Sequence, residues 1–315
     1  MPLTSAPFLS DIAFGAPGGV AYWAQTSDAK RIRIGAWQRP EAKGTVLIFP
    51  GRTEFIEKYD ICAAQLAQRG LASMAIDWRG QGLADRMLDN PLIGHVDSFP
   101  DYQKDVDALL RTARTLEMPR PFFLLAHSMG GAIGLRAAME GLSVQATAFS
   151  GPMWGIKLAP HLRPFAWALS HVMPLIGRGA GLPPGTKIEH HVLTDGFEGN
   201  LLTRDPEQFD FMRKQLETHP ELALGGPSFV WLREALRETR HLATRPSPNL
   251  PCVTFVGTNE RIVETSAIQT RMAKWKDGTL ELVANGEHEV LMESEAVAGP
   301  LFDKVAALFL KRGHG

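Results

Sequence analysis

The sequence has few of the features that would mark a secreted or membrane protein. Its 315 residues include only two cysteines, Cys62 and Cys252, in apolar surroundings and without metal-ligand spacing, so we expect buried, reduced thiols and no disulfide framework. No stretch reaches the roughly 18 consecutive apolar residues of a membrane span. The N-terminus lacks the basic region and apolar run of a secretory signal. These absences predict a cytoplasmic protein, with contact at the inner face of a membrane left open.

An excess of charge of one sign is also missing. The chain carries 33 basic and 34 acidic residues, a formal net charge of -1 at pH 7, so nothing predicts a nucleic-acid partner. What the chain does have is apolar material: 44% of the residues are hydrophobic, enough for a sizeable globular core. Composition does not predict an oligomeric state.

Short apolar runs alternate with helical patterns along most of the chain. This alternation predicts βαβ crossovers and a mostly parallel central sheet flanked by helices, preceded by a hairpin, which is an α/β fold. From 152 to 248 no segment is typical of a strand, and prolines separate helical pieces. We therefore expect a core of residues 1–151 and 249–315, with a helical cap of residues 152–248 inserted after the sixth strand. The expected strands cover residues 20–26, 31–38, 45–49, 71–76, 122–126, 145–150, 252–257 and 279–283.

Ser128 is the strongest candidate for a nucleophile. Residues 122–131 (FFLLAHSMGG) have the pattern of a strand, a sharp turn and a helix, and they match a nucleophile elbow with Ala126 in place of its usual first glycine. The turn needs small neighbours because strand and helix approach closely, and it holds the hydroxyl clear of the backbone. The Met129 N–H then begins the helix, where it can face a developing oxyanion.

A serine hydroxyl needs a base, and His288 is the best placed of the ten histidines. It follows the last expected strand in a glycine-containing loop, at the sheet edge that carries Ser128. His127 is adjacent to Ser128 in sequence, but we expect its side chain to point away. Glu260, three residues beyond Gly257, is the candidate acid that orients the base, with Glu264 as its competitor.

The loop after the expected strand 45–49 is a candidate for a second oxyanion donor. Gly51 permits close approach of the backbone, and the Arg52 N–H follows it. An ordinary strand-to-helix turn would have the same pattern, so the loop alone does not decide between the two. The resulting order of serine, acid and histidine is that of α/β-hydrolases.

With these residues assembled, the sequence resembles the bacterial lysophospholipases and monoacylglycerol lipases of the serine aminopeptidase-like α/β-hydrolases. The resemblance rests on residues 50–54 (PGRTE), 77–82 (DWRGQG), 126–131 (AHSMGG), 200–203 (NLLT), 257–260 (GTNE) and 286–289 (GEHE). In the family's segment that corresponds to residues 257–260, the last position is usually aspartate. The resemblance implies an α/β-hydrolase fold and hydrolysis of a single-acyl lipid ester through an acyl-enzyme, without metal or organic cofactor. It also implies structural roles for Asp77 and Arg79.

The insert is strongly apolar and includes Trp154, Phe165 and Trp167. Two interpretations stay open: these side chains bind the acyl chain of the substrate and touch a membrane surface, or they only pack the cap onto the core. The alternatives to a lipid substrate are a general carboxylic ester and a peptide or amide, as in an aminopeptidase. An acidic pocket in the cap would favour the amide.

Overall fold

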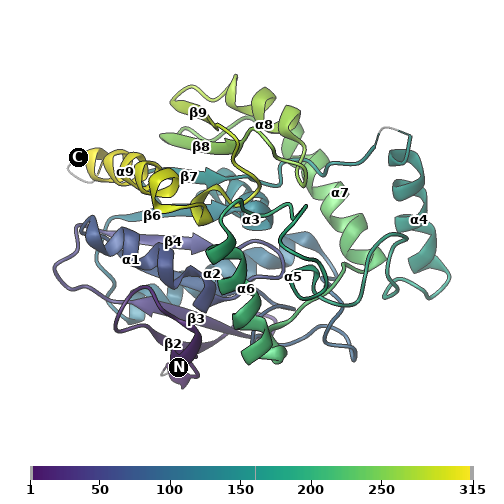
Figure 1. Cartoon of the computed structure of the whole chain (residues 1–315), viewed down its shortest axis with the longest axis horizontal. Coiled ribbons are helices and arrows are strands. Elements are labelled where there is room, and N and C mark those ends of the chain that lie inside the picture. The colour runs from purple at the N-terminus through teal and green to yellow at the C-terminus, as the bar shows by residue number, and fades with distance from the viewer. Residues whose placement is uncertain (1–2, 160, 313–315) are drawn as a thin grey trace.

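A nine-stranded sheet forms the centre of the molecule (Figure 1), in a computed structural model that describes residues 3–159 and 161–312. The strand order is β1-β2-β3-β5-β4-β6-β7-β8-β9. Strands β1 to β3 pair antiparallel, β3 pairs antiparallel with β5, and all the later pairings are parallel, as expected. The strands are β1 (Thr4–Ala6), β2 (Val20–Gln25), β3 (Arg31–Trp37), β4 (Thr45–Phe49), β5 (Ala72–Asp77), β6 (Phe122–His127), β7 (Thr147–Ser150), β8 (Cys252–Gly257) and β9 (Gly278–Val283).

Helices cover both faces of this sheet. Because side chains alternate along a strand, Val46 and Ile48 of β4 belong to one apolar core and Leu47 and Phe49 to the other. The first core includes residues of α1 (Asp60–Gln68) and α9 (Glu295–Arg312). The second includes residues of α2 (Tyr102–Thr115), α3 (Ser128–Met139) and α8 (Thr265–Met272). Burial on both faces explains why the inner strands are continuous apolar runs.

Buried ion pairs hold the loops that follow β4 and β5. Arg33 donates to Asp77 at 2.7 Å and, through both terminal nitrogens, to Glu57 at 2.8 Å. Asp77 also accepts from the N–H groups of Ile56 and Leu83, each at 2.9 Å. Arg79 pairs with Asp28 and Asp105. These contacts are structural and match the expectation for Asp77 and Arg79.

The segment between β7 and β8 is helical, and its described residues contribute no strand to the sheet. Its α-helices are α4 (Arg163–Leu175), α5 (His191–Thr194), α6 (Pro206–Thr218) and α7 (Phe229–Thr244). α4 packs against α7 and stands at the right-hand edge of Figure 1. None of the helices formed by residues 3–159 and 161–312 is long and apolar enough to cross a bilayer.

One expectation about this insert was wrong in detail. It follows the seventh strand and not the sixth, because β1 precedes the strands that the sequence pattern predicts. A strand of three residues is too short to show a periodicity. The division into a core of residues 1–151 and 249–315 and a cap of residues 152–248 stays a prediction.

Candidate active site

Ser128 lies on a strained turn between β6 and α3. Its φ is 49°, in a region that residues other than glycine rarely adopt. Gly130 is required there, because a Cβ at this position would lie 2.1 Å from the Phe49 carbonyl oxygen. Ala126, which replaces the usual glycine, has its methyl group beside Gly134: a Cβ on Gly134 would lie 3.3 Å from it. Gly134, one helical turn after Gly130, therefore makes room for the alanine.

His288 pairs with Glu260 and not with Glu264. His288 Nδ1 lies 2.6 Å from Glu260 Oε2, and both side chains are buried. The other oxygen of Glu260 accepts from the N–H groups of Ile262, at 2.6 Å, and Val263, at 3.0 Å. Glu264 instead pairs with Arg163 at 2.6 Å. The sequence left these two acids open, and the geometry favours Glu260 as the partner of His288.

Glu260 is held in its charged form. Burial raises the pKa of its carboxyl, but the hydrogen bond and charge of His288 and the two backbone N–H groups outweigh burial and lower the pKa below its ordinary value. A carboxylate only accepts hydrogen bonds, so His288 carries its proton on Nδ1 when it is neutral. Nε2 is then free to accept a proton, as a base requires.

Glycines bring the loops of Glu260 and His288 close together. Gly151 follows β7 with a φ of 47°, and a Cβ there would lie 3.0 Å from His288 Nδ1. At the end of β8, a Cβ on Gly257 would lie 2.1 Å from the Gly286 carbonyl oxygen. The Asn259 N–H donates to that same oxygen at 3.0 Å. The insert between β7 and β8 contributes too, since the N–H groups of His288 and Glu289 donate to the carbonyls of the 200–203 segment.

The loop after β4 binds the backbone N–H groups on either side of Arg52 to side chains. Gln81 accepts from the Thr53 N–H at 3.2 Å and donates to the Gly51 carbonyl at 3.0 Å, and Glu54 accepts from the Gly51 N–H. Thr53 has a φ of 69°, which is strained for a β-branched residue. Among the described residues, the N–H groups of Arg52 and Met129 have no protein acceptor. These are the two donors that the sequence analysis assigns to the oxyanion.

A buried network lies beneath this loop. Lys58, in the 3₁₀ turn Ile56–Tyr59, donates to Glu54 at 2.6 Å and to Glu289 at 2.5 Å. The Tyr59 hydroxyl also donates to Glu54 at 2.5 Å. Because Glu54 binds the Gly51 N–H and Glu289 follows His288 directly, one ammonium links the loop after β4 to the loop that carries His288. This role of Lys58 was not predicted from the sequence, although the spacing of Glu54 and Lys58, four residues apart, is that of an ion pair.

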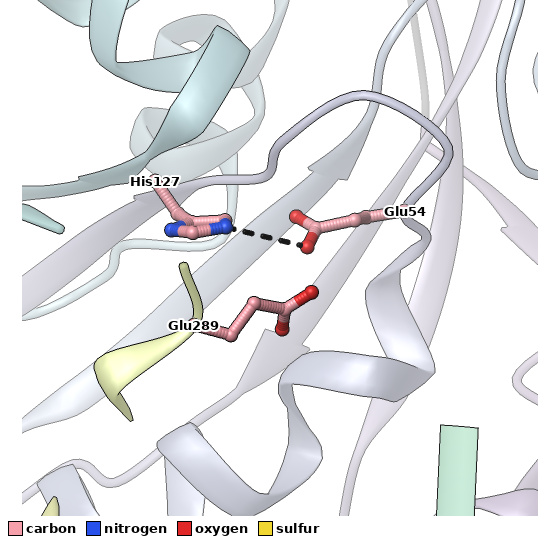
Figure 2. Close-up of side chains that lie close together, drawn as sticks. All are labelled: Glu54, His127 and Glu289. Atoms are coloured by element: carbon pink, nitrogen blue, oxygen red, sulfur yellow. Dashed lines mark ion pairs between the residues drawn. The ribbon is translucent and has the colours of Figure 1, made fainter. Parts of the chain in front are cut away.

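Figure 2 shows Glu54, His127 and Glu289 converging, and one ligand atom from each lies within 4.8 Å of the others. Such a group could hold a metal ion, but here the Lys58 ammonium already binds both carboxylates. His127 Nδ1 donates to the Ser150 carbonyl at 2.9 Å, and burial lowers the pKa of His127. We therefore assign the position of the cation to Lys58, with His127 neutral.

A cavity of about 630 Å³ lies over Ser128 and is also lined by His288, Arg52 and Met129. This volume is typical of small-molecule sites. The insert between β7 and β8 contributes apolar walls and polar groups, and the rest of the chain contributes further apolar walls. Besides the four already named, the wall includes Met153, Ile156, Leu202, Phe209, Met212, Leu216, Trp231, Ile262, His190, His191, Asp195 and Glu198.

The three cap aromatics expected to bind substrate do not line this cavity, which corrects that expectation. Trp154 is buried against Phe149 and Trp275, with its N–H donating to the Gly131 carbonyl at 3.0 Å. Trp167 lies on α4 beside His171. Phe165 is 67% exposed. Apolar character alone did not distinguish a residue that packs the cap, or faces solvent, from one that lines the cavity.

Two histidines that were not chosen as candidates from the sequence, His190 and His191, also line the cavity. His190 is buried, and its Nδ1 caps α5 by accepting from the Val192 N–H at 3.2 Å. Burial and the neighbouring charges hold its pKa well below the ordinary value, so it is neutral. The adjacent pair of histidines in the sequence was the only available signal, and it carries no information about placement.

A serine on a strand-to-helix turn, a histidine–carboxylate pair on later loops and a mostly parallel sheet define the α/β-hydrolase class. Residues 40–295 match the Hydrolase_4 family, described as serine aminopeptidase, S33, and the chain belongs to this family.

Named relatives agree with that membership. The chain is 28% identical to lysophospholipase L2 of Escherichia coli K12, over 91% of this chain and 88% of that protein. It is 23% identical to the phospholipase YtpA of Bacillus subtilis, over 77% of this chain and 84% of that protein. Among solved structures, it is similar in fold to a soluble variant of Saccharomyces cerevisiae monoglyceride lipase in complex with a substrate analogue. The TM-score is 0.72 at 19% identity, covering 98% of this chain and 99% of that one.

Proposed function

We propose that this chain is a serine hydrolase that cleaves the carboxylic ester of a single-acyl lipid, a lysophospholipid or a monoacylglycerol. The observation that carries the proposal is the shared cavity of Ser128 and His288, with Glu260 bound 2.6 Å from His288 Nδ1. The names of the relatives support the substrate class, since they include a lysophospholipase and a monoglyceride lipase.

In the proposed mechanism, Ser128 Oγ attacks the ester carbonyl while His288 Nε2 takes its proton. The N–H groups of Arg52 and Met129 donate to the oxyanion. His288 then gives the proton to the leaving alcohol, and the acyl group stays on Ser128. Water activated by His288 hydrolyses this acyl-enzyme. Glu260 keeps the ring oriented throughout, and the steps need no metal or organic cofactor.

We further propose that residues 152–248 act as a cap whose inner face receives the acyl chain. In place of the expected Trp154, Phe165 and Trp167, the apolar side chains that line the cavity include Met153, Phe209 and Trp231. Burying an acyl chain there contributes on the order of 0.8 kcal/mol per methylene group. A cavity of this volume fits one chain better than two, which supports a single-acyl substrate.

We also propose that α4 touches a membrane surface. Leu175 is 84% exposed, Phe165 67% and the adjoining Ile176 61%, and α4 contains no acidic residue. An exposed apolar face of this kind is typical of an interfacial helix. Flotation with phosphatidylglycerol vesicles tests the contact: Phe165→Ser/Leu175→Ser should release the protein. The control Leu282→Ser, which changes a 58% exposed leucine of β9, should still bind. If the wild type is a dimer and the double variant is a monomer, the exposed face of α4 is instead a contact between two copies of the chain.

The substrate test is hydrolysis of lysophosphatidylcholine and monoacylglycerol by the wild type and by Ser128→Ala. We expect turnover of long-chain lipids that falls on the order of a million-fold in the variant. If only short p-nitrophenyl esters are hydrolysed, the assignment of Ser128 as the nucleophile stands and the protein is a general carboxylesterase.

A second candidate function is hydrolysis of an aminoacyl amide. Asp195 and Glu198 line the cavity, as a site for a free amino group would require. Lys187 lies 3.0 Å from Asp195 and neutralises it, which weakens this candidate. Turnover of aminoacyl p-nitroanilides that exceeds turnover of both lipids would establish the second function.

A further inference from the structure

The side chain of Arg52 lies where the cap meets the core, within the cavity of Ser128. Its Nη1 donates to the Gly225 carbonyl at 2.6 Å. The guanidinium carbon is 5.7 Å from the centre of the Trp231 ring. Gly94 makes room on the other side, since a Cβ there would lie 3.3 Å from Nη1. Backbone and an aromatic ring therefore hold this guanidinium in place.

Arg52 has no carboxylate partner among the described residues, unlike Arg33 and Arg79 of the core. Arg33 and Arg79 each bind two carboxylates. A guanidinium has five N–H donors, and that of Arg52 uses one of them on Gly225. An enclosed positive charge without a counter-ion is costly, and burial lowers the pKa of Arg52 to about 10, which still leaves it charged at neutral pH. The structure thus keeps a cation with free donors beside the nucleophile.

The neighbouring groups do not supply the missing negative charge. His190 is neutral, and Asp195 is paired with Lys187. Glu198 is exposed on the wall of the same cavity and makes no ion pair with Arg52. The free donors of Arg52 are therefore available to an anion that enters with the substrate.

We propose that the Arg52 guanidinium binds the phosphate of a lysophospholipid head group while the N–H of the same residue binds the ester carbonyl. The inference rests on the proposed function and selects, within its substrate class, the lipid that carries a phosphate. Arginine matches phosphate geometry with paired N–H donors. Both contacts come from one residue, so their separation is set by a single side chain. The three-carbon glycerol that joins the acyl ester to the phosphate has a comparable reach.

The discriminating experiment compares kcat/KM for lysophosphatidylcholine and monoacylglycerol with the same acyl chain. Arg52→Gln retains the backbone N–H and a side-chain donor for Gly225 but removes the charge. We expect the ratio of the two kcat/KM values to fall about 10- to 100-fold, mainly through the KM of the phospholipid. Arg52→Lys keeps the positive charge but lacks the paired N–H donors, so its ratio should lie between those of the wild type and Arg52→Gln. Arg237→Gln, a change at an arginine whose side chain is 59% exposed, is the matched control and should keep the ratio.

An equal loss for both lipids would mean that Arg52 only anchors the loop at Gly225, and it would overturn the inference while the proposed function stands. A wild type that cleaves neither lipid would remove the proposed function. Titration of glycerophosphocholine into Ser128→Ala protein then decides the inference separately. Binding that Arg52→Gln weakens at least tenfold would support it, and binding that Arg52→Gln leaves unchanged would refute it.

Discussion

Removing the Lys58 ammonium should destabilise the protein strongly. Lys58→Met keeps the apolar stem but leaves Glu54 and Glu289 facing each other without their shared cation. Each of these three side chains is only 6% exposed. Deleting one partner of a buried ion pair typically costs about 3–5 kcal/mol. At about 2–4 °C per kcal/mol for a domain of this order of size, we expect the Tm to fall on the order of ten degrees.

Lys104→Met is the matched control. Lys104 also binds two carboxylates, those of Asp28 at 3.0 Å and Asp101 at 2.7 Å, but its side chain is 39% exposed. Exposed pairs contribute about 0–1 kcal/mol, so its Tm should stay within a few degrees of the wild type. Differential scanning calorimetry of the three proteins measures both effects.

The cost of Lys58→Met should also depend on pH in a definite direction. In the wild type, burial raises the pKa of Glu54, but the charge of Lys58 and the hydrogen bonds from Lys58 and Tyr59 help to outweigh burial and lower it. Without Lys58, burial is left to raise the pKa of the carboxyl, which then takes up a proton in the folded state as the pH falls. The Tm difference should therefore be largest near pH 7 and smaller near pH 5. A Tm equal to that of Lys104→Met, or a difference independent of pH, would refute the role of Lys58.

Two further predictions concern the histidine and its acid. Because the pKa of Glu260 is lowered in the folded state, its charge stabilises the fold above the ordinary carboxyl pKa, and that stabilisation is lost as the pH falls through the folded value. The Tm of Glu260→Gln should thus differ most from the wild type at pH 7 and approach it below about pH 4, with kcat lower by about 10⁴-fold at neutral pH. Gly151→Ala should lower kcat more than Gly141→Ala, since both have a positive φ but only Gly151 has His288 within 4 Å of a new Cβ. Equal kcat values for the two alanine variants would contradict the close approach.

Much of the fold could be predicted because its signals are local. Inner strands such as 45–49 and 122–126 are continuous apolar runs, and the turn at Ser128 has small residues where strand and helix meet. The order of the strands then puts the loops of Ser128, Glu260 and His288 at one edge of the sheet. That is why the candidate residues could be chosen from the sequence alone.

The features of the site that could not be predicted depend on distances between residues far apart in the sequence, or on burial, and local sequence patterns indicate neither. Glu260 and Glu264 have equivalent chemistry, and only the tertiary structure shows which of them approaches His288. Lys58 and Glu289 are 231 residues apart in the sequence, so their pairing had no signal. The cap aromatics Trp154 and Phe165 were equally apolar in the sequence, but one is buried in the core and the other is exposed to solvent.

The most direct test of Ser128 as the nucleophile and His288 as its base is labelling with a fluorophosphonate probe, followed by mass spectrometry of the digested protein. We expect a single adduct on Ser128, absent from Ser128→Ala and formed far more slowly in His288→Gln, because the hydroxyl reacts only when a base takes its proton. Labelling that persists in Ser128→Ala, or that proceeds equally fast in His288→Gln, would contradict the assignment of the nucleophile and its base.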